Sequence, residues 1–346
     1  MLRAAALAVA LAGVSTPAQA PDPFVTWRGN AGPGLGKTIV FVTGDEEYRS
    51  EESMPQLAQI LAVRLGFTCT VLFAVDPKTG AIDPGVVDNI PGTGALAGAD
   101  LMVVFTRFRD LPDAQMQPFV DYVESGRPIV GLRTATHAFD VVRHERWRRW
   151  SWRSGEWQGG FGRQVLGETW IAHHGEHGRQ GTRGIVAEAA TDHAILRGIA
   201  SGDVWDPADV YAVRLPLPVG CSPLLLGEVL AGTQPDAPAA KAAAGRPDPN
   251  EPKMPVAWTR AYRAGNGKQA RVFTTTIGSA QAFVREGTRR LLVNACLWCV
   301  GLEAAIRPDL DVRLVGDFAP GSFGFGGHKR GVLPADLLRA RVARPK

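Results

Sequence analysis

Near-continuous apolar runs alternate with amphipathic segments in the first part of this chain, and this alternation most restricts its fold. The predicted strands share β-branched and apolar residues; they are residues 37–44, 69–75, 101–106 and 127–132. Helices predicted at 50–65 and 112–125 carry apolar side chains on one face. Strands without polar alternation are buried on both faces. The first 140 residues therefore predict a doubly wound α/β unit, with a mainly parallel sheet and helices on both faces.

The second half of the sequence is less regular. Residues 143–180 form an irregular insertion rich in Trp, Arg and His, and residues 231–254 are typical of a surface loop. A closing helix is expected at 286–300. Further strands are expected at 182–188, 209–214, 222–229, 255–262 and 270–277. We expect one α/β domain over residues 37–303, preceded by a lead-in at 21–36 and followed by a C-terminal extension at 304–346.

The N-terminus has the pattern of a secretory signal peptide at residues 1–20. Arg3 precedes an apolar run from Ala4 to Val14, and Ala18-Gln19-Ala20 is a cleavage signature. The run is well short of the roughly 20 residues that span a bilayer. We therefore expect a periplasmic or secreted protein, cut after Ala20, with no membrane span in the mature chain.

Charge and cysteine content give no reason to expect nucleic-acid binding or a Cys-based metal or redox site. The formal net charge is only +4, so composition gives no reason to expect a nucleic-acid partner. An oxidising compartment permits disulfides among the four cysteines without specifying their pairing. Cys296 and Cys299 lie in an apolar helical segment, where small buried hydrophobes are expected rather than a zinc or redox site. The oligomeric state stays open.

Polar side chains come directly after three of the predicted strands. Packing of a buried strand gives no reason for polar residues at these positions. The carboxyl ends of parallel strands meet at one edge of a sheet, so these side chains predict a site that binds a polyhydroxylated molecule and moves a proton. The alternative is a salt-bridged loop surface. The residues are Asp45, Glu46, Tyr48, Arg107, Arg133, Thr134 and His137.

His173, His174 and His177 form the densest histidine cluster. His173 with His177, or His174 with His177, can supply two ligands to a metal, while Gly175 weakens a regular helix at this point. Proton transfer or hydrogen bonding to substrate is the alternative role. The sequence requires no cofactor, and a divalent metal stays an option.

Tryptophans are concentrated in the insertion. Five of the nine lie between residues 147 and 170, among several arginines. Indole faces stack on sugar rings, so in an exported protein this arrangement favours a carbohydrate platform over single-stranded nucleic acid. Packing beneath a long loop is the competing explanation.

Several separated segments together resemble the trehalose-utilisation (ThuA-like) family, over roughly residues 37–303. The segments are 39–45, 129–139, 159–162, 170–175, 192–199, 209–211, 255–258 and 271–278. The resemblance implies the flavodoxin-like fold of class I glutamine amidotransferases. It also implies a carbohydrate substrate, as in exported members from bacteria that degrade complex carbohydrate.

Two positions depart from the patterns of these relatives. Amidotransferases place their nucleophilic Cys after Gly and an aliphatic residue, but here Arg133 follows Gly131 and Leu132, so glutamine hydrolysis is not expected. Ser279 stands where many relatives place a His, which puts any role of that His in doubt.

The resemblance and the loops together predict an exported protein that acts on a small-molecule sugar or keto-sugar by acid–base chemistry. A hydrolase, lyase or isomerase would fit. The alternatives are a non-catalytic sugar-binding module and a metal-dependent hydrolase built on His173, His174 and His177. The predicted catalytic residues are His137, His173, His174, Asp45 and Glu46. The predicted substrate-binding residues are Tyr48, Arg107, Arg133, Thr134, Trp170 and Trp258.

Overall fold

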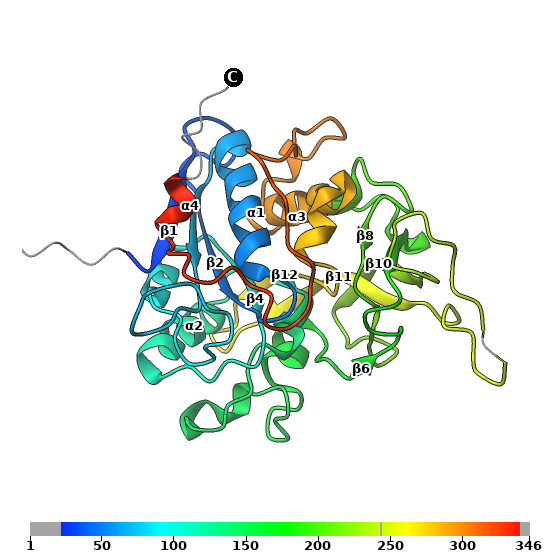
Figure 1. Cartoon of the computed structure of the whole chain (residues 1–346), viewed down its shortest axis with the longest axis horizontal. Coiled ribbons are helices and arrows are strands. Elements are labelled where there is room, and N and C mark those ends of the chain that lie inside the picture. The colour runs from blue at the N-terminus through cyan, green and yellow to red at the C-terminus, as the bar shows by residue number, and fades with distance from the viewer. Residues whose placement is uncertain (1–21, 243, 340–346) are drawn as a thin grey trace, which may run out of the picture.

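The apolar segments of the chain pair into one ten-stranded sheet (Figure 1). The computed structural model describes residues 22–242 and 244–339, so the predicted signal peptide at residues 1–20 lies outside the described residues. The strand order is β1-β3-β2-β4-β5-β12-β11-β10-β7-β8. The strands are β1 (Phe24–Arg28), β2 (Thr38–Gly44), β3 (Thr68–Leu72), β4 (Leu101–Thr106), β5 (Ile129–Leu132), β7 (Thr182–Val186), β8 (Trp205–Asp206), β10 (Cys221–Val229), β11 (Met254–Arg263) and β12 (Gln269–Thr275).

The sheet is mixed, with a parallel centre. Strands β3, β2, β4, β5 and β12 run parallel to one another. At one edge β1 pairs antiparallel with β3, and at the other β11, β10, β7 and β8 continue antiparallel. The expectation of a mainly parallel sheet therefore holds for the centre only. The lead-in at 21–36 contributes the edge strand β1, whose Val25 and Trp27 side chains are buried.

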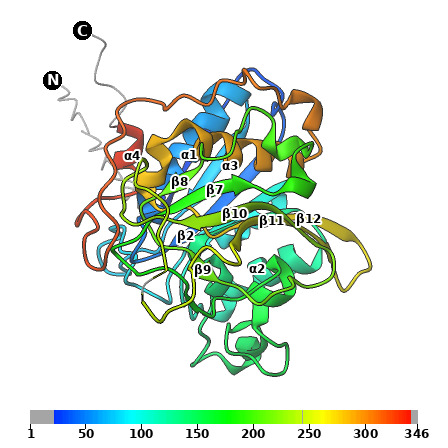
Figure 2. The ribbon, with the colours of Figure 1, turned by 90° about the vertical axis from the view of Figure 1, so that its right-hand side faces the viewer.

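Helices cover both faces of the sheet (Figure 2). They are α1 (Ser50–Leu65), α2 (Asp113–Glu124), α3 (Glu286–Cys299) and the short α4 (Asp336–Arg339). Successive side chains of a strand point to opposite faces. Phe41 of β2 therefore packs in the core that contains α1 and α3, and Val40 packs in the core that contains α2.

The insertion at 143–180 folds into short helical turns and one very short strand. Trp147 and Trp150 are buried and pack in the α2 core, where Trp150 lies against Phe119. These two tryptophans therefore serve packing. Beyond them, β6 (Ala172–His173) pairs with β9 (Tyr211–Ala212) in a separate two-stranded sheet.

After α3 the described chain returns across the molecule to α4. In Figure 1 this return is the orange-to-red trace that passes the lower end of α1. Within it, Gly324 N–H donates to the carbonyl of Glu47 at 2.7 Å, directly after β2. The C-terminal extension therefore reaches the edge of the sheet where the parallel strands end.

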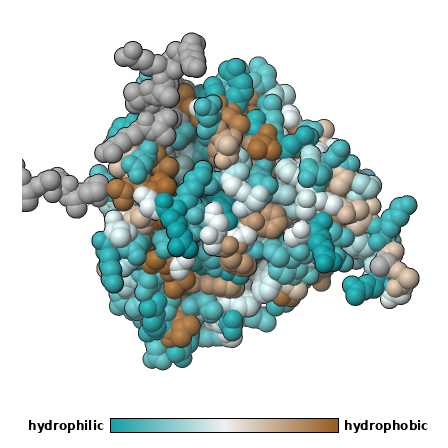
Figure 3. All heavy atoms as spheres, viewed as in Figure 1, coloured by the Kyte–Doolittle hydropathy of each residue, from teal (hydrophilic) through white to brown (hydrophobic). Residues whose placement is uncertain are grey.

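The surface and the cysteines complete the description of the fold. The face seen in Figure 3 is mostly hydrophilic, with separate apolar patches. Among the described residues, no helix is both long enough and apolar enough to cross a membrane. The four cysteines are unpaired, and Cys296 and Cys299 are buried as expected.

Candidate active site

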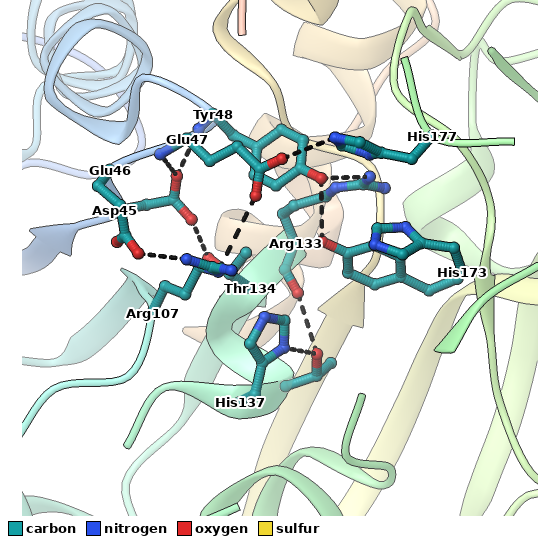
Figure 4. A network of polar contacts seen from close by, with 12 residues as sticks. Asp45, Glu46, Glu47, Tyr48, Arg107, Arg133, Thr134, His137, His173 and His177 are labelled. Carbon is teal, nitrogen blue, oxygen red and sulfur yellow. Dashed lines mark hydrogen bonds and ion pairs between the residues drawn. The ribbon is translucent and has the colours of Figure 1, made fainter. Parts of the chain in front are cut away.

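The loops that follow β2, β4 and β5 converge at one edge of the sheet (Figure 4). The β2 loop holds the acidic residues, β4 is followed by Arg107, and β5 runs into the short turn η2 (Arg133–His137). Because parallel strands end at the same edge, side chains far apart in sequence meet here.

Asp45 joins two of these loops from a fully buried position. Its carboxylate accepts hydrogen bonds from the backbone N–H of Glu47 at 2.8 Å, from the N–H of Tyr48 and from the Thr134 hydroxyl. Asp45 therefore fixes the conformation of the acidic loop and ties it to the turn after β5.

Glu46 pairs with two arginines of the β4 loop. One carboxylate oxygen contacts Arg107 and the other lies 2.9 Å from Arg109, which is completely buried. The Glu46 side chain is about a fifth exposed, as is that of Arg107. This ion-pair group holds Arg107 at the surface of the site.

Arg133 occupies a strained turn in the interior. Its φ is +44°, an unfavourable value for a side chain with a Cβ. The buried guanidinium donates to the carbonyls of Asp209 and Thr276 at 2.7 Å, and to the Tyr48 hydroxyl at 3.1 Å. It also lies over the rings of Tyr48 and Tyr211. Arg133 therefore holds the polar floor of the site together.

Two histidines contact one buried carboxylate. His173 Nδ1 lies 2.7 Å from one oxygen of Asp209, and His177 Nδ1 lies 3.0 Å from the other. The second ring nitrogen of His177 lies 3.0 Å from Glu47. Both histidine side chains are more than a third exposed, whereas Asp209 is fully buried. The site thus presents two reachable imidazoles above fixed carboxylates.

The carboxylates of this group have opposite pKa shifts. Burial and the neighbouring charge of Asp45 raise the pKa of Glu47 above its ordinary value. Burial alone would raise the pKa of Asp209 as well, but hydrogen bonds from His173 and His177 and the charge of Arg133 lower it. Asp209 is therefore the ionised partner, and Glu47 keeps a proton more readily.

His137 lies beside this group but is buried. Burial, followed by the charges of Arg107 and Arg133, holds the pKa of His137 well below its usual value. Its Nδ1 lies 3.1 Å from the Thr136 hydroxyl, and its ring contacts Trp170 with 5.5 Å between ring centroids. His137 is therefore a neutral ring behind Trp170.

Two predicted site residues lie outside this network. His174 points away, with its Nε2 2.8 Å from the carbonyl of Pro249. Trp258 is buried in the sheet and donates from its indole to the carbonyl of Leu166 at 2.7 Å.

Aromatic rings border the histidines. Trp170 lies 5.6 Å from His173 between ring centroids, and Phe323 of the C-terminal segment lies 5.8 Å from His177. Phe323 also stacks on Tyr48 at 5.5 Å. The reachable imidazoles are therefore each bordered by an aromatic ring.

A model of the ThuA family, described as trehalose utilisation, matches residues 87–299, which is more than half of the chain. The chain belongs to this family. The ThuA match includes the β4 and β5 loops and both exposed histidines, and it ends before the C-terminal segment that carries Phe323.

Two solved ThuA-like structures resemble the chain. One, from Parabacteroides merdae ATCC 43184, is 17% identical with a TM-score of 0.45 and covers 76% of this chain and 90% of its own. The other, from Bacteroides uniformis ATCC 8492, is 15% identical with a TM-score of 0.41 and covers 82% of this chain and 98% of its own. A search of curated proteins found no match.

Sequence reasoning missed several residues of this candidate site. Glu47 stands next to the residues that were selected, but its partner His177 lies 130 positions away in a segment without regular pattern. Asp209 and Tyr211 lie in a segment that the resemblance includes, which is the one signal that could have found them. Phe323 and Phe325 lie in a Gly-rich tail that has no periodicity to place it.

Within the described residues, His173, His177 and Asp209 are the one group whose ligand atoms, all within 4.8 Å of one another, could hold a metal ion. The same atoms can instead exchange protons with a ligand. The arrangement therefore supports either acid–base or metal-assisted chemistry.

Proposed function

We propose that this ThuA-family chain is an exported protein that processes a sugar or keto-sugar by proton transfer, with His173 and Asp209 as its acid–base pair. The 2.7 Å contact between His173 Nδ1 and Asp209 carries the proposal. Because this contact engages Nδ1, the other ring nitrogen is the one that can exchange a proton with a ligand. The exposed fraction of the His173 side chain, 38%, lets a ligand reach it.

Glu47 and His177 supply the complementary proton. Burial raises the pKa of Glu47, so this carboxyl group holds its proton more tightly than an ordinary glutamate and suits the role of an acid. His177 contacts Glu47 through one ring nitrogen and Asp209 through the other, both at 3.0 Å. A proton can therefore move along this chain of groups. We assign the role of partner acid to Glu47 rather than to Asp45 or Glu46, because both of these are engaged in fixing the loops.

The surroundings support a sugar as the ligand. Trp170 and Phe323 place aromatic rings beside the histidines, and Arg107 offers a cation that can bind a hydroxyl or an oxyanion. The description of the family, trehalose utilisation, points to the same class of substrate. The signal pattern in residues 1–20 supports export.

Proton transfer can be tested by proton NMR in D₂O with a panel of disaccharides and their keto forms. We expect a product, or deuterium at the carbon next to a carbonyl, with the wild-type chain. His173→Ala should lower kcat by about 10²- to 10⁴-fold, the usual worth of a positioned acid or base. His137→Ala tests the other predicted base, and His144→Ala is the control.

Equal turnover by His173→Ala would exclude the proposed pair. Saturable binding with neither product nor exchange would instead identify a non-catalytic sugar-binding module.

A metal-dependent hydrolase is the second candidate, and the three clustered ligand atoms of His173, His177 and Asp209 favour it. Glu47 contacts the second ring nitrogen of His177, and a carboxylate in this position commonly orients a metal-bound imidazole. In that case His173 is a ligand and not a base. Turnover lost in EDTA and restored by Zn²⁺ would support the metal route, whereas turnover indifferent to chelator would support direct proton transfer.

A further inference from the structure

The C-terminal strap, which we define as residues 321–328, is held against the β2 loop by several hydrogen bonds. Gly324 N–H donates to the Glu47 carbonyl at 2.7 Å, and the Arg49 guanidinium donates to the Gly324 carbonyl. Gly321 N–H donates to the Glu52 carboxylate at 2.7 Å. These bonds attach the strap to the loop that carries the acidic residues of the site and to the first turn of α1, which contains Glu52.

The strap follows a path that requires glycine. Gly324 and Gly326 have φ values of +136° and +70°, which side chains with a Cβ rarely adopt. Phe323 and Phe325 lie on either side of Gly324. The local sequence therefore bends the strap while presenting two aromatic rings.

The two rings have different environments. Phe323 faces inward and stacks on Tyr48 beside His177. Phe325 is 63% exposed, and its ring lies 5.1 Å from the Arg107 guanidinium. Packing of the core does not account for so exposed an aromatic ring.

The Arg107 guanidinium contacts two phenylalanine rings. The second ring is that of Phe108, whose centroid lies 4.6 Å from the guanidinium, and Phe108 also lines a hollow of about 630 Å³. That hollow is lined further by Asp88, Asp140 and Arg143. The Phe108 and Phe325 rings beside the Arg107 guanidinium suit the apolar faces and the hydroxyl groups of a sugar ring.

We propose that Phe325 and Arg107 form a second sugar subsite, which binds one ring of a disaccharide or longer glycoside while the other ring lies at the histidines. This proposal takes from the proposed function only that the ligand is a sugar, and it does not depend on the acid–base chemistry. The strap lies beyond residues 87–299, outside the region that matches the family model. By carrying Phe325, the strap makes the site selective for glycosides over single sugars.

Binding without turnover tests the subsite separately from the chemistry. Isothermal titration of the full mature chain, carrying His173→Ala, would use trehalose, maltose and cellobiose as probes and glucose as the single-ring comparison. We expect at least one disaccharide to bind, and Phe325→Ala to raise its Kd by about tenfold, equivalent to 1.4 kcal/mol. The Kd of glucose should stay unchanged.

Two further variants make the result specific. Phe325→Trp keeps a ring face and should restore binding, and Leu338→Ala, another exposed residue of the C-terminal extension, should have no effect. An equal Kd for Phe325→Ala, an equal loss for glucose, or no binding of any of the three disaccharides would overturn the subsite. Failure of the acid–base proposal alone would leave this binding intact.

Discussion

The Asp209–Arg133 pair connects stability with function at the level of single residues. Both side chains are fully buried, and Asp209 also anchors His173 and His177. A carboxylate that bonds an internal arginine and two surface histidines fixes the histidines relative to the sheet. Substitutions of Asp209 are therefore expected to act on folding as well as on the proposed acid–base pair.

Asp209→Asn should lower the free energy of unfolding by about 3–5 kcal/mol, because it leaves the buried Arg133 without its counter-charge. Urea denaturation of the variant and the wild type measures the difference. Asp317→Asn, at an exposed position, is the control. A loss no larger than in the control would show that the pair contributes little.

A second buried acid predicts the pH dependence of stability. Burial raises the pKa of Glu51 to about 8 from an ordinary value of 4.5. The folded state then binds the proton more tightly than the unfolded state, so this contribution is complete below pH 4.5 and is lost as the pH rises through about 8.

Glu51→Gln removes this dependence. Between pH 5 and pH 9, wild-type unfolding free energy should fall more than that of the variant, by on the order of 4 kcal/mol. Denaturation at the two pH values measures it, with the exposed Glu188→Gln as the control. Parallel pH profiles for wild type and Glu51→Gln would contradict the raised pKa.

Elements with a strong pattern were predicted well from the sequence. The strand β4 and the helices α1, α2 and α3 lie at or within one residue of the predicted bounds, because apolar periodicity alone identifies them. The predicted strand at 209–214 is reduced to the two residues of β9. Asp209, two residues before β9, is held by contacts with Arg133, His173 and His177. These partners are distant in sequence, so a local sequence pattern does not predict the position of Asp209.

Convergence of the loops after β2, β4 and β5 also followed from the sequence, since parallel topology brings these strand ends together. Asp45, Arg107 and Arg133 accordingly meet at one edge (Figure 4). The strap could not be predicted, because its position depends on tertiary hydrogen bonds such as that of Gly324 with Glu47.

Removing the inner ring of the strap should loosen this element. Phe323→Ala loses the stacking on Tyr48, and we expect trypsin to cleave after Lys329 or Arg330 several-fold faster. Mass spectrometry of timed digests identifies the site. Trypsin should cleave the Phe325→Ala variant at the wild-type rate, because the Phe325 ring is exposed and does not hold the strap in place. Unchanged cleavage in Phe323→Ala would indicate that hydrogen bonds alone hold the strap.

At the scale of the whole molecule, the apolar cores and the candidate site lie in different parts of the sheet. Its two apolar cores lie on opposite faces, and the polar network lies where the parallel strands end. The antiparallel strands β11, β10, β7 and β8 extend the sheet away from the parallel centre. The ThuA fold thus leaves one edge free for loops and for the strap.

Export is a prediction for the whole chain. When the full sequence is produced in a bacterial host with a secretory pathway, we expect the exported protein to begin at Pro21, because the cut follows Ala20. Cell fractionation and N-terminal mass spectrometry measure this. A chain that keeps Met1 and stays in the cytoplasm would refute it.

A crystal structure of His173→Asn with a disaccharide tests the central claim most directly, because the variant can bind the sugar without proton transfer. The account predicts one sugar ring within hydrogen-bonding distance of residue 173 and beside His177, with the second ring on Phe325. A sugar bound only elsewhere, such as in the hollow lined by Gly198, Asp203 and Arg290, would contradict it.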